Sequence, residues 1–175
     1  MNKKNLIDIL PMNVQIGAEI GVMKGDASDL MLSERESLTL YMIDPWDMLN
    51  PEYFQKDSKF YRKDGGSANW YKIACDVAKK YGDRAVIMKE FSHIASYQFK
   101  DGFFDFVFID GDHSYPACDL DLKLWVPKIK PGGLIIGHDY GTKLHDGVKR
   151  AFDEFAIRHN VELKKEDNAL VWGKI

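Results

Sequence analysis

The segment FVFIDGDHSYP, residues 106–116, ends an apolar run with three side chains that can do chemistry. These side chains are Asp110, Asp112 and His113. Carboxylates can hold a cation, and an imidazole can take up or release a proton near neutral pH. A second pair of such groups, His138 and Asp139, follows the later apolar run LIIG. Whether these groups meet depends on the elements that carry them.

Seven short apolar runs are predicted to be β-strands, and helical segments lie between most of them. The predicted strands are residues 14–20, 38–43, 85–88, 104–109, 134–136, 161–165 and 169–172. The predicted helices are residues 26–32, 69–81, 92–97, 118–126 and 147–158. Ser92 is placed to cap the third of these helices. Leu120 and Leu124 are expected on the inner face of the fourth, and Trp125 is a further candidate for that face.

The middle strands are nearly continuous apolar runs, which is typical of strands that are buried on both faces of a parallel sheet. Alternation of such strands with helices predicts a doubly wound α/β fold with helices on both faces. The two closely spaced C-terminal strands predict an antiparallel hairpin at one edge of a mostly parallel, seven-stranded sheet. All 175 residues are expected to form a single domain.

Each of the first five predicted strands ends in acidic or hydrogen-bonding residues. These are Glu19, then Asp44, then Glu90 and Ser92, then Asp110 with Asp112 and His113, and finally His138 and Asp139. In open α/β sheets ligands bind beyond the carboxyl ends of the strands. The sequence therefore predicts one ligand site along this edge of the sheet.

The turn after the first strand distinguishes between nucleotide ligands. Its glycines are Gly17, Gly21 and Gly25, a wider spacing than the G-x-G-x-x-G pattern that lets a pyrophosphate approach a helix N-terminus. The spacing disfavours NAD, and the acidic Glu19 beside the turn favours a cationic ligand. Asp44 is placed to accept both hydroxyls of a ribose, a feature that NAD enzymes share.

Three stretches together resemble class I S-adenosylmethionine-dependent methyltransferases. AEIGVMKGDAS is similar to their E/D-x-G-x-x-x-G loop. FVFIDGDHSY and LWVPKIKPGGLIIGHDYG resemble the small O-methyltransferases that include macrolide-sugar and catechol-type enzymes. The resemblance covers residues 14–140 in order. It implies the Rossmann-like fold of that class and S-adenosylmethionine as the cofactor.

The resemblance also implies roles for residues of this chain. Glu19, Gly21 and Gly25 match the loop around the methionine part of the cofactor, and Ser28 is expected to meet its carboxylate. Asp44 matches the ribose-binding acid. The positions beside the adenine are matched by Phe91 and Ser92, and Asp110 also lies at the cofactor edge.

A divalent cation such as Mg²⁺ and a general base are implied as well. Asp110 and Asp139 match metal ligands, and His113 matches the proposed base of the sugar methyltransferases. Position 138 departs from the pattern, since the metal-dependent sugar enzymes have an acid there. His138 as a third ligand favours a softer divalent ion, and a site without metal is the alternative. For Asp112, a helix cap and a substrate contact are both open.

The resulting hypothesis is an O-methyltransferase that acts on the hydroxyl of a small molecule, sugar-like or phenol-like. The alternative is a catalytically inactive module that binds S-adenosylmethionine. The aromatic and basic segment 45–67 is expected to be a lid or substrate wall. Either this segment or the partner in a homodimer is expected to close the site.

Composition limits the binding partners and the cellular compartment that we expect for this chain. The net charge of −3 favours neither nucleic acid nor an anionic membrane as a partner. No stretch approaches the roughly 18 apolar residues of a membrane span, and the N-terminal residues are too poor in apolar side chains for a signal peptide. Two widely separated cysteines, Cys75 and Cys118, fit a reduced, cytoplasmic setting.

Overall fold

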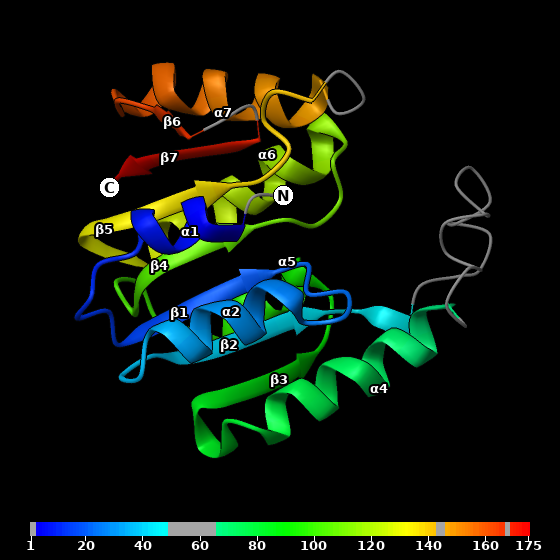
Figure 1. Ribbon diagram of the computed structural model, residues 1–175. Helices are drawn as coiled ribbons and strands as arrows, with labels where there is room; N and C mark the ends of the chain where they lie inside the picture. The colour runs from blue at the N-terminus through cyan, green and yellow to red at the C-terminus, as the bar shows by residue number, and fades with distance from the viewer. Residues whose placement is uncertain (1–2, 49–65, 143–145, 167–168) are drawn as a thin grey trace.

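The strands form one sheet in the order β3-β2-β1-β4-β5-β7-β6 (Figure 1). The structure is a computed structural model, and it describes residues 3–48, 66–142, 146–166 and 169–175. The first five strands are parallel, whereas β7 is antiparallel to β5 and to β6. The predicted α/β sheet with its antiparallel edge hairpin is therefore confirmed. The strands are β1 (Ile16–Ile20), β2 (Thr39–Asp44), β3 (Ala85–Lys89), β4 (Phe104–Ile109), β5 (Ile129–Gly137), β6 (Lys164–Glu166) and β7 (Leu170–Lys174).

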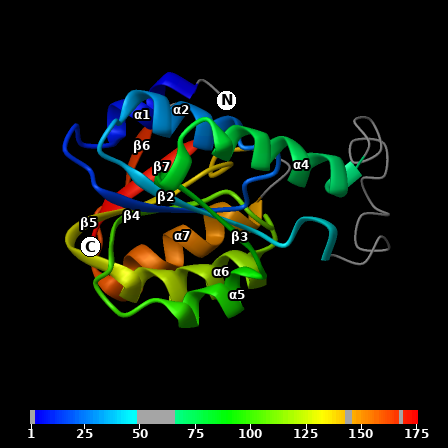
Figure 2. The same cartoon turned by 90° about the horizontal axis from the view of Figure 1, so that it is seen from below.

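Helices cover both faces of the sheet (Figure 2). One layer consists of α1 (Lys3–Ile9), α2 (Asp26–Glu34) and α4 (Gly66–Lys79). The other consists of α5 (Ser92–Ala95), α6 (Tyr115–Trp125) and α7 (Asp146–His159). Short 3₁₀ turns occur at η1 (Trp46–Met48), η3 (Gly82–Arg84), η4 (Ser96–Gln98) and η5 (Val126–Lys128). Among the described residues, no helix combines the length and the apolar character needed to cross a membrane.

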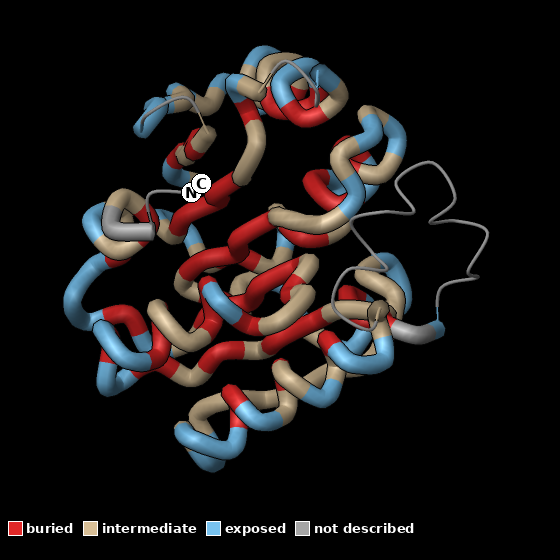
Figure 3. Tube along the Cα trace, turned by 45° about the vertical axis from the view of Figure 1, so that its right-hand side comes forward, coloured by how far each residue is buried: buried red, intermediate tan, exposed pale blue. Residues whose placement is uncertain are grey.

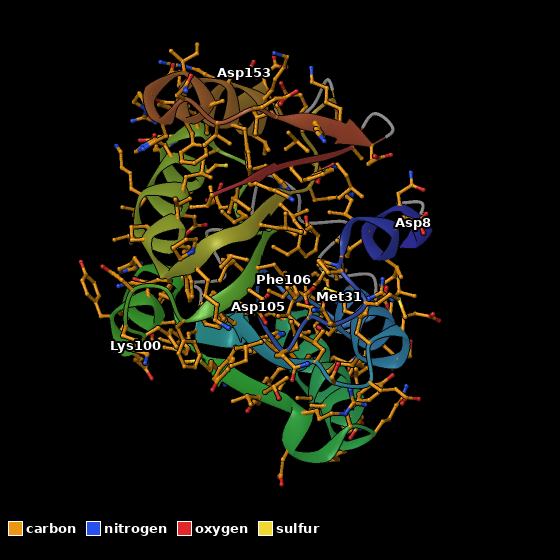
Figure 4. All side chains as sticks on the ribbon, turned by 90° about the vertical axis from the view of Figure 1, so that its left-hand side faces the viewer. Asp8, Met31, Lys100, Asp105, Phe106 and Asp153 are labelled. Carbon is orange, nitrogen blue, oxygen red and sulfur yellow. The ribbon has the colours of Figure 1, made fainter. Side chains whose placement is uncertain are left out.

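The central strand β4 shows why the sheet needs two helical layers. Phe106 and Phe108 are fully buried in the core beneath α1, α2 and α4, while Val107 and Ile109 are buried in the core beneath α5, α6 and α7. Buried residues accordingly concentrate in the strands (Figure 3). Each such side chain contributes roughly 1.5–3 kcal/mol through its burial. Phe106, which is labelled with Met31 of the same core in Figure 4, packs so closely on β1 that a Cβ at Gly17 would lie 2.2 Å from its ring.

Helix α1 was not among the helices expected from the sequence. Leu6 of this helix and Leu10, directly after it, are buried in the core. Its carboxyl end is held by the buried Arg35, whose guanidinium donates to the carbonyl oxygens of Ile7 at 2.6 Å, Leu10 at 2.7 Å and Pro11 at 3.2 Å. A cation that satisfies the last carbonyls stabilises a helix that is otherwise too short to persist. The helix thus depends on a side chain far away in the sequence.

The inner face of α6 includes Trp125 and the partly buried Leu124, as expected, but not Leu120. Leu120 is 44% exposed, and the buried apolar side chains are Cys118, Leu122 and Trp125. The helix begins at Tyr115, after the N-cap Ser114, and its buried residues follow the i, i+4, i+7 spacing of one helical face. Leu120 lies off that face, so its apolar character alone was misleading.

Candidate functional site

The carboxyl ends of four neighbouring strands meet at one edge of the sheet. In the register, Ile20 of β1 lies opposite Ile43 of β2 and Ile109 of β4, and Ile109 lies opposite Gly137 of β5. The backbone ladder continues into the loops, since the Gly21 N–H donates to the Ile43 carbonyl at 2.9 Å. The polar residues that follow these strands are therefore brought together, as the sequence predicted.

The turn after β1 needs glycine at its first position. Gly21 has a φ of 88°, and a Cβ there would lie 2.3 Å from the backbone oxygen of Asp110. Met23 and Gly25 also have positive φ, at 51° and 82°. The turn closes on itself through the Gly25 N–H, which donates to the Val22 carbonyl at 2.8 Å. The 21–25 loop is thus tightly curled against the loop that carries Asp110.

Glu19 and Ser28 face each other beneath this loop. Glu19 is 1% exposed, and the buried Ser28 hydroxyl donates to its carboxylate. Burial raises the pKa of Glu19 well above its ordinary value, and the hydrogen bond from Ser28 offsets part of this rise. The charges of Asp110 and Asp44 raise it further. In this structure the Ser28 hydroxyl is therefore used as a hydrogen-bond donor to Glu19.

Asp44 holds the neighbouring loops together. Its Oδ2 accepts the backbone N–H groups of Val22 and Met23, both at 2.9 Å, and its Oδ1 accepts the N–H of Trp46 at 2.6 Å. Burial raises the pKa of Asp44 although these hydrogen bonds oppose the rise. A carboxylate offers about four lone-pair sites, so Oδ1 keeps one acceptor site for a ligand.

Beyond β3, Phe91 and Ser92 occupy the start of α5. Phe91 is the N-cap residue, and no side chain caps this helix, so Ser92 is not the cap that was expected. The Ser92 hydroxyl instead donates to Asp121 of α6 and accepts the indole N–H of Trp125 at 2.8 Å. Asp121 is 7% exposed, and the sequence analysis did not select it. The sequence offered one indication of its burial: on a helix, position 121 lies near the face that carries Cys118, Leu122 and Trp125.

Asp121 gives a prediction about pH. Burial raises its pKa to about 6, against the hydrogen bond from Ser92, whereas the unfolded chain has the ordinary 3.8. Between pH 4 and pH 6 the folded state binds more protons, so this group lowers the free energy of unfolding as the pH rises, by about 3 kcal/mol in total. Asp121→Asn should therefore gain stability relative to the parent protein between pH 4 and pH 7.5 in urea denaturation. An equal difference in the free energy of unfolding between variant and parent at pH 4 and at pH 7.5 would contradict this. Asp83→Asn, at an exposed position, is the control and should show no such pH dependence.

Asp110, His113, His138 and Asp139 form one cluster at the ends of β4 and β5. The Nε2 atom of His113 lies 2.9 Å from Asp139 Oδ2 and 3.8 Å from Asp110 Oδ1. The Nδ1 atom of His138 lies 3.1 Å from each of the same two oxygens. Two carboxylates thus face two imidazoles, and the three candidate metal ligands of the sequence analysis lie together with the candidate base.

The electrostatics of this cluster follow from these contacts. Burial alone would lower the pKa of both imidazoles, but the contacts with Asp110 and Asp139 outweigh it and raise the pKa of His113 to about 9 and that of His138 to about 10. Burial would likewise raise the pKa of Asp139, but His113 and His138 hold it well below its usual range. Opposite charges that are partly withdrawn from water account for these directions.

A metal could be held by part of the cluster. Ligand atoms of Asp110, His113 and Asp139 all lie within 4.8 Å of one another, and all three residues are half-buried. The Nδ1 atom of His138 contacts the same two carboxylates, but His138 is not part of this group. Carboxylate oxygens together with an imidazole suit a divalent ion that accepts both nitrogen and oxygen.

The remaining candidates lie outside this cluster or outside the described residues. Asp112 is exposed, and its carboxylate accepts the Ser114 N–H at 2.8 Å, directly before α6. It therefore shapes the turn into the helix, close to the capping role that was considered. Most of the proposed 45–67 lid, residues 49–65, lies outside the described residues. Trp46, at the beginning of that segment, is buried.

Comparisons with known proteins agree with this geometry. Residues 18–140 match a family model described as a methyltransferase domain. The comparison with curated proteins gives no match.

Solved structures share the fold. The O-methyltransferase NovP is 20% identical with a TM-score of 0.68, and the match covers 99% of this chain and 77% of NovP. An O-methyltransferase from Bacillus cereus, in complex with SAH, is 16% identical with a TM-score of 0.65, over 99% and 79% of the two chains. The SAH-bound methyltransferase PaMTH1 from Podospora anserina is 15% identical with a TM-score of 0.66, over 98% and 75%.

Proposed function

The chain belongs to the methyltransferase domain family, and on this basis we propose that it transfers a methyl group from S-adenosylmethionine to a hydroxyl group of a small molecule. Two structural neighbours, NovP and the Bacillus cereus enzyme, are O-methyltransferases and support oxygen as the acceptor atom. The Bacillus cereus enzyme and PaMTH1 are bound to SAH, which supports the choice of cofactor. A sugar-like or phenol-like acceptor is the class that the sequence resemblance favours.

The observation that carries the proposal is the concentration of carboxylates around the 21–25 loop. Glu19, Asp44 and Asp110 lie at the ends of three different strands; burial is the main cause of the raised pKa of Glu19, and the charges of Asp110 and Asp44 raise it further. A positively charged ligand would relieve this repulsion. S-adenosylmethionine carries a sulfonium and an ammonium group, whereas the pyrophosphate of NAD would add negative charge. The site therefore favours the sulfonium cofactor.

We assign the chain's residues to the parts of this cofactor as follows. Gly21 and Gly25 shape the loop for the methionine end, Glu19 is the buried acid whose ionised form a cationic ligand would favour, and Ser28 orients Glu19. The remaining acceptor site of Asp44 receives a ribose hydroxyl. Phe91 and Ser92 lie beside the adenine, together with Asp110 at the edge of the site. These contacts hold the reacting groups in line, which is a large part of catalysis in such transfers.

When bound, the cofactor supplies an electrophilic methyl group, and the chain must then remove the proton of the acceptor hydroxyl. We assign this step to His113. Its half-buried imidazole lies between Asp110 and Asp139, which stabilise the imidazolium that forms on proton uptake. The raised pKa makes His113 a stronger proton acceptor, although it leaves a smaller fraction of the imidazole unprotonated at neutral pH.

Asp110 and Asp139 are also the proposed ligands of a divalent cation, with His138 or His113 as the nitrogen ligand. A bound cation such as Mg²⁺ would hold oxygens of the acceptor and lower the pKa of its hydroxyl. His113 cannot ligate a cation and accept the proton with the same nitrogen. With His138 as the nitrogen ligand, His113 would be available as the base.

Isothermal titration with S-adenosylhomocysteine tests the cofactor assignment. We expect saturable binding at micromolar concentrations, and no binding at high micromolar ligand would refute the assignment. Methyl transfer is then measured over a panel of sugar and phenol acceptors, with EDTA, Mg²⁺ or Mn²⁺. Transfer to any acceptor shows an active enzyme, and binding without transfer to any of them would point to an inactive binding module.

A further inference from the structure

Two residues with large side chains have a backbone conformation that such residues rarely adopt. Met23, in the 21–25 loop, has a φ of 51°, and Trp46, directly after β2, has a φ of 42°. Among the described residues, the only others with positive φ besides glycine are Asp139 and Asn160, whose side chains tolerate it better. Such strain persists only where the surroundings enforce it, and it is concentrated at functional sites.

Hydrogen bonds link Met23 and Trp46 and hold both residues in this backbone conformation. The Trp46 indole Nε1–H donates to the Met23 carbonyl at 2.8 Å. Asp44 accepts the backbone N–H of both residues, from Met23 at 2.9 Å and from Trp46 at 2.6 Å. The two strained residues and the carboxylate between them thus form a closed ring of hydrogen bonds.

The indole ring of Trp46 is also packed within the core. Trp46 is 1% exposed and belongs to the core beneath α1, α2 and α4. Its ring packs on Tyr71 of α4, with 5.0 Å between the ring centroids. Because the ring is buried and packed on Tyr71, we expect the position of its N–H to set the position of the Met23 carbonyl and, through it, the path of the 21–25 loop.

We propose that Trp46 is a positioning residue for the cofactor, whose indole N–H holds the 21–25 loop in the shape that accepts the methionine end. This inference rests on the proposed function. It adds a residue to the site, and it gives Asp44 a second task, as the brace that joins this loop to Trp46.

Trp46→Phe tests the proposal because it keeps an aromatic ring beside Tyr71 and removes only the donor. Loss of a buried hydrogen bond to the loop should weaken S-adenosylhomocysteine about tenfold in isothermal titration. Adenosine, which lacks the homocysteine end, should bind within about twofold of its affinity for the parent protein. Unchanged affinity for S-adenosylhomocysteine would overturn the proposal, and so would an equal loss for both ligands, which would indicate a general structural role.

Trp172→Phe is the matched control. It makes the same change on β7, where the buried indole Nε1 has no hydrogen-bond partner in the described part of the chain. Affinity for both ligands should stay as in the parent protein. If the parent protein binds adenosine but not S-adenosylhomocysteine, or binds neither, the proposed function fails before Trp46 is tested.

The unmodified protein offers a second test should Trp46→Phe fail to fold. In a ¹⁵N NMR spectrum, the assigned indole N–H of Trp46 should shift with S-adenosylhomocysteine and stay in place with adenosine. The indole N–H of Trp125, bonded to Ser92, should shift with both ligands. A Trp46 signal that responds equally to both ligands, or to neither, would overturn the proposal.

Discussion

Gly21→Ala is expected to abolish binding of S-adenosylhomocysteine and to destabilise the fold by about 3 kcal/mol or more. Alanine at a φ of 88° is strained, and its Cβ would lie 2.3 Å from the backbone oxygen of Asp110 and 2.6 Å from the Gly111 Cα. Backbone atoms cannot swing aside as a flexible side chain can. Relief of this contact would separate the 21–25 loop from the Asp110 loop, which together form the centre of the proposed site.

Gly132→Ala is the control that separates the effect of backbone strain from the effect of the close contact. Gly132 has nearly the same φ, 83°, but a Cβ there would meet nothing within 4 Å. This control should lose only about 1–2 kcal/mol of stability and keep its affinity for S-adenosylhomocysteine. Urea denaturation and isothermal titration on both variants measure the two effects. If Gly21→Ala behaved like Gly132→Ala, the close approach of the two loops would not matter for the site.

The sheet and the place of the site could be predicted because both depend on short-range signals. An apolar run such as FVFI indicates a strand that is buried on both faces, and the residue that follows it must lie at the sheet edge. Asp44 and Asp110 could be placed at that edge for this reason alone. The predicted face of α6 was wrong at Leu120, because the phase of a short helix depends on where it begins.

The remaining features depend on contacts between residues that are distant in sequence. Helix α1 is held by Arg35, and Ser92 is bonded to Asp121, 29 positions away. Nothing in the local pattern of Asp44 indicated that three backbone N–H groups would occupy most of its acceptor sites. Side-chain partners of this kind decide how a predicted residue acts, and they become visible only when the chain is folded.

His113→Ala is expected to lower kcat by about 10²–10⁴-fold, because the chain would lose the group that accepts the acceptor's proton. Affinity for S-adenosylhomocysteine should change by less than about twofold, since the hydrogen bonds that shape the 21–25 loop come from Ile43, Asp44, Trp46 and the loop itself. His159→Ala, at the exposed end of α7, is the control and should leave kcat unchanged. An unchanged kcat in His113→Ala would remove this residue as the base.

The two possible roles of His113 predict different rescue of the His113→Ala variant. If His113 is the base, added imidazole can enter the space left by the ring and restore part of kcat, while additional Mg²⁺ or Mn²⁺ has no effect. If His113 is a metal ligand together with Asp110 and Asp139, the variant binds the cation more weakly and a higher concentration of the cation restores activity, with or without imidazole. His138, 3.1 Å from both carboxylates, remains in place in this variant and still provides a nitrogen ligand. Rescue by imidazole with no response to added cation would therefore support His113 as the base, with His138 as the proposed nitrogen ligand beside Asp110 and Asp139.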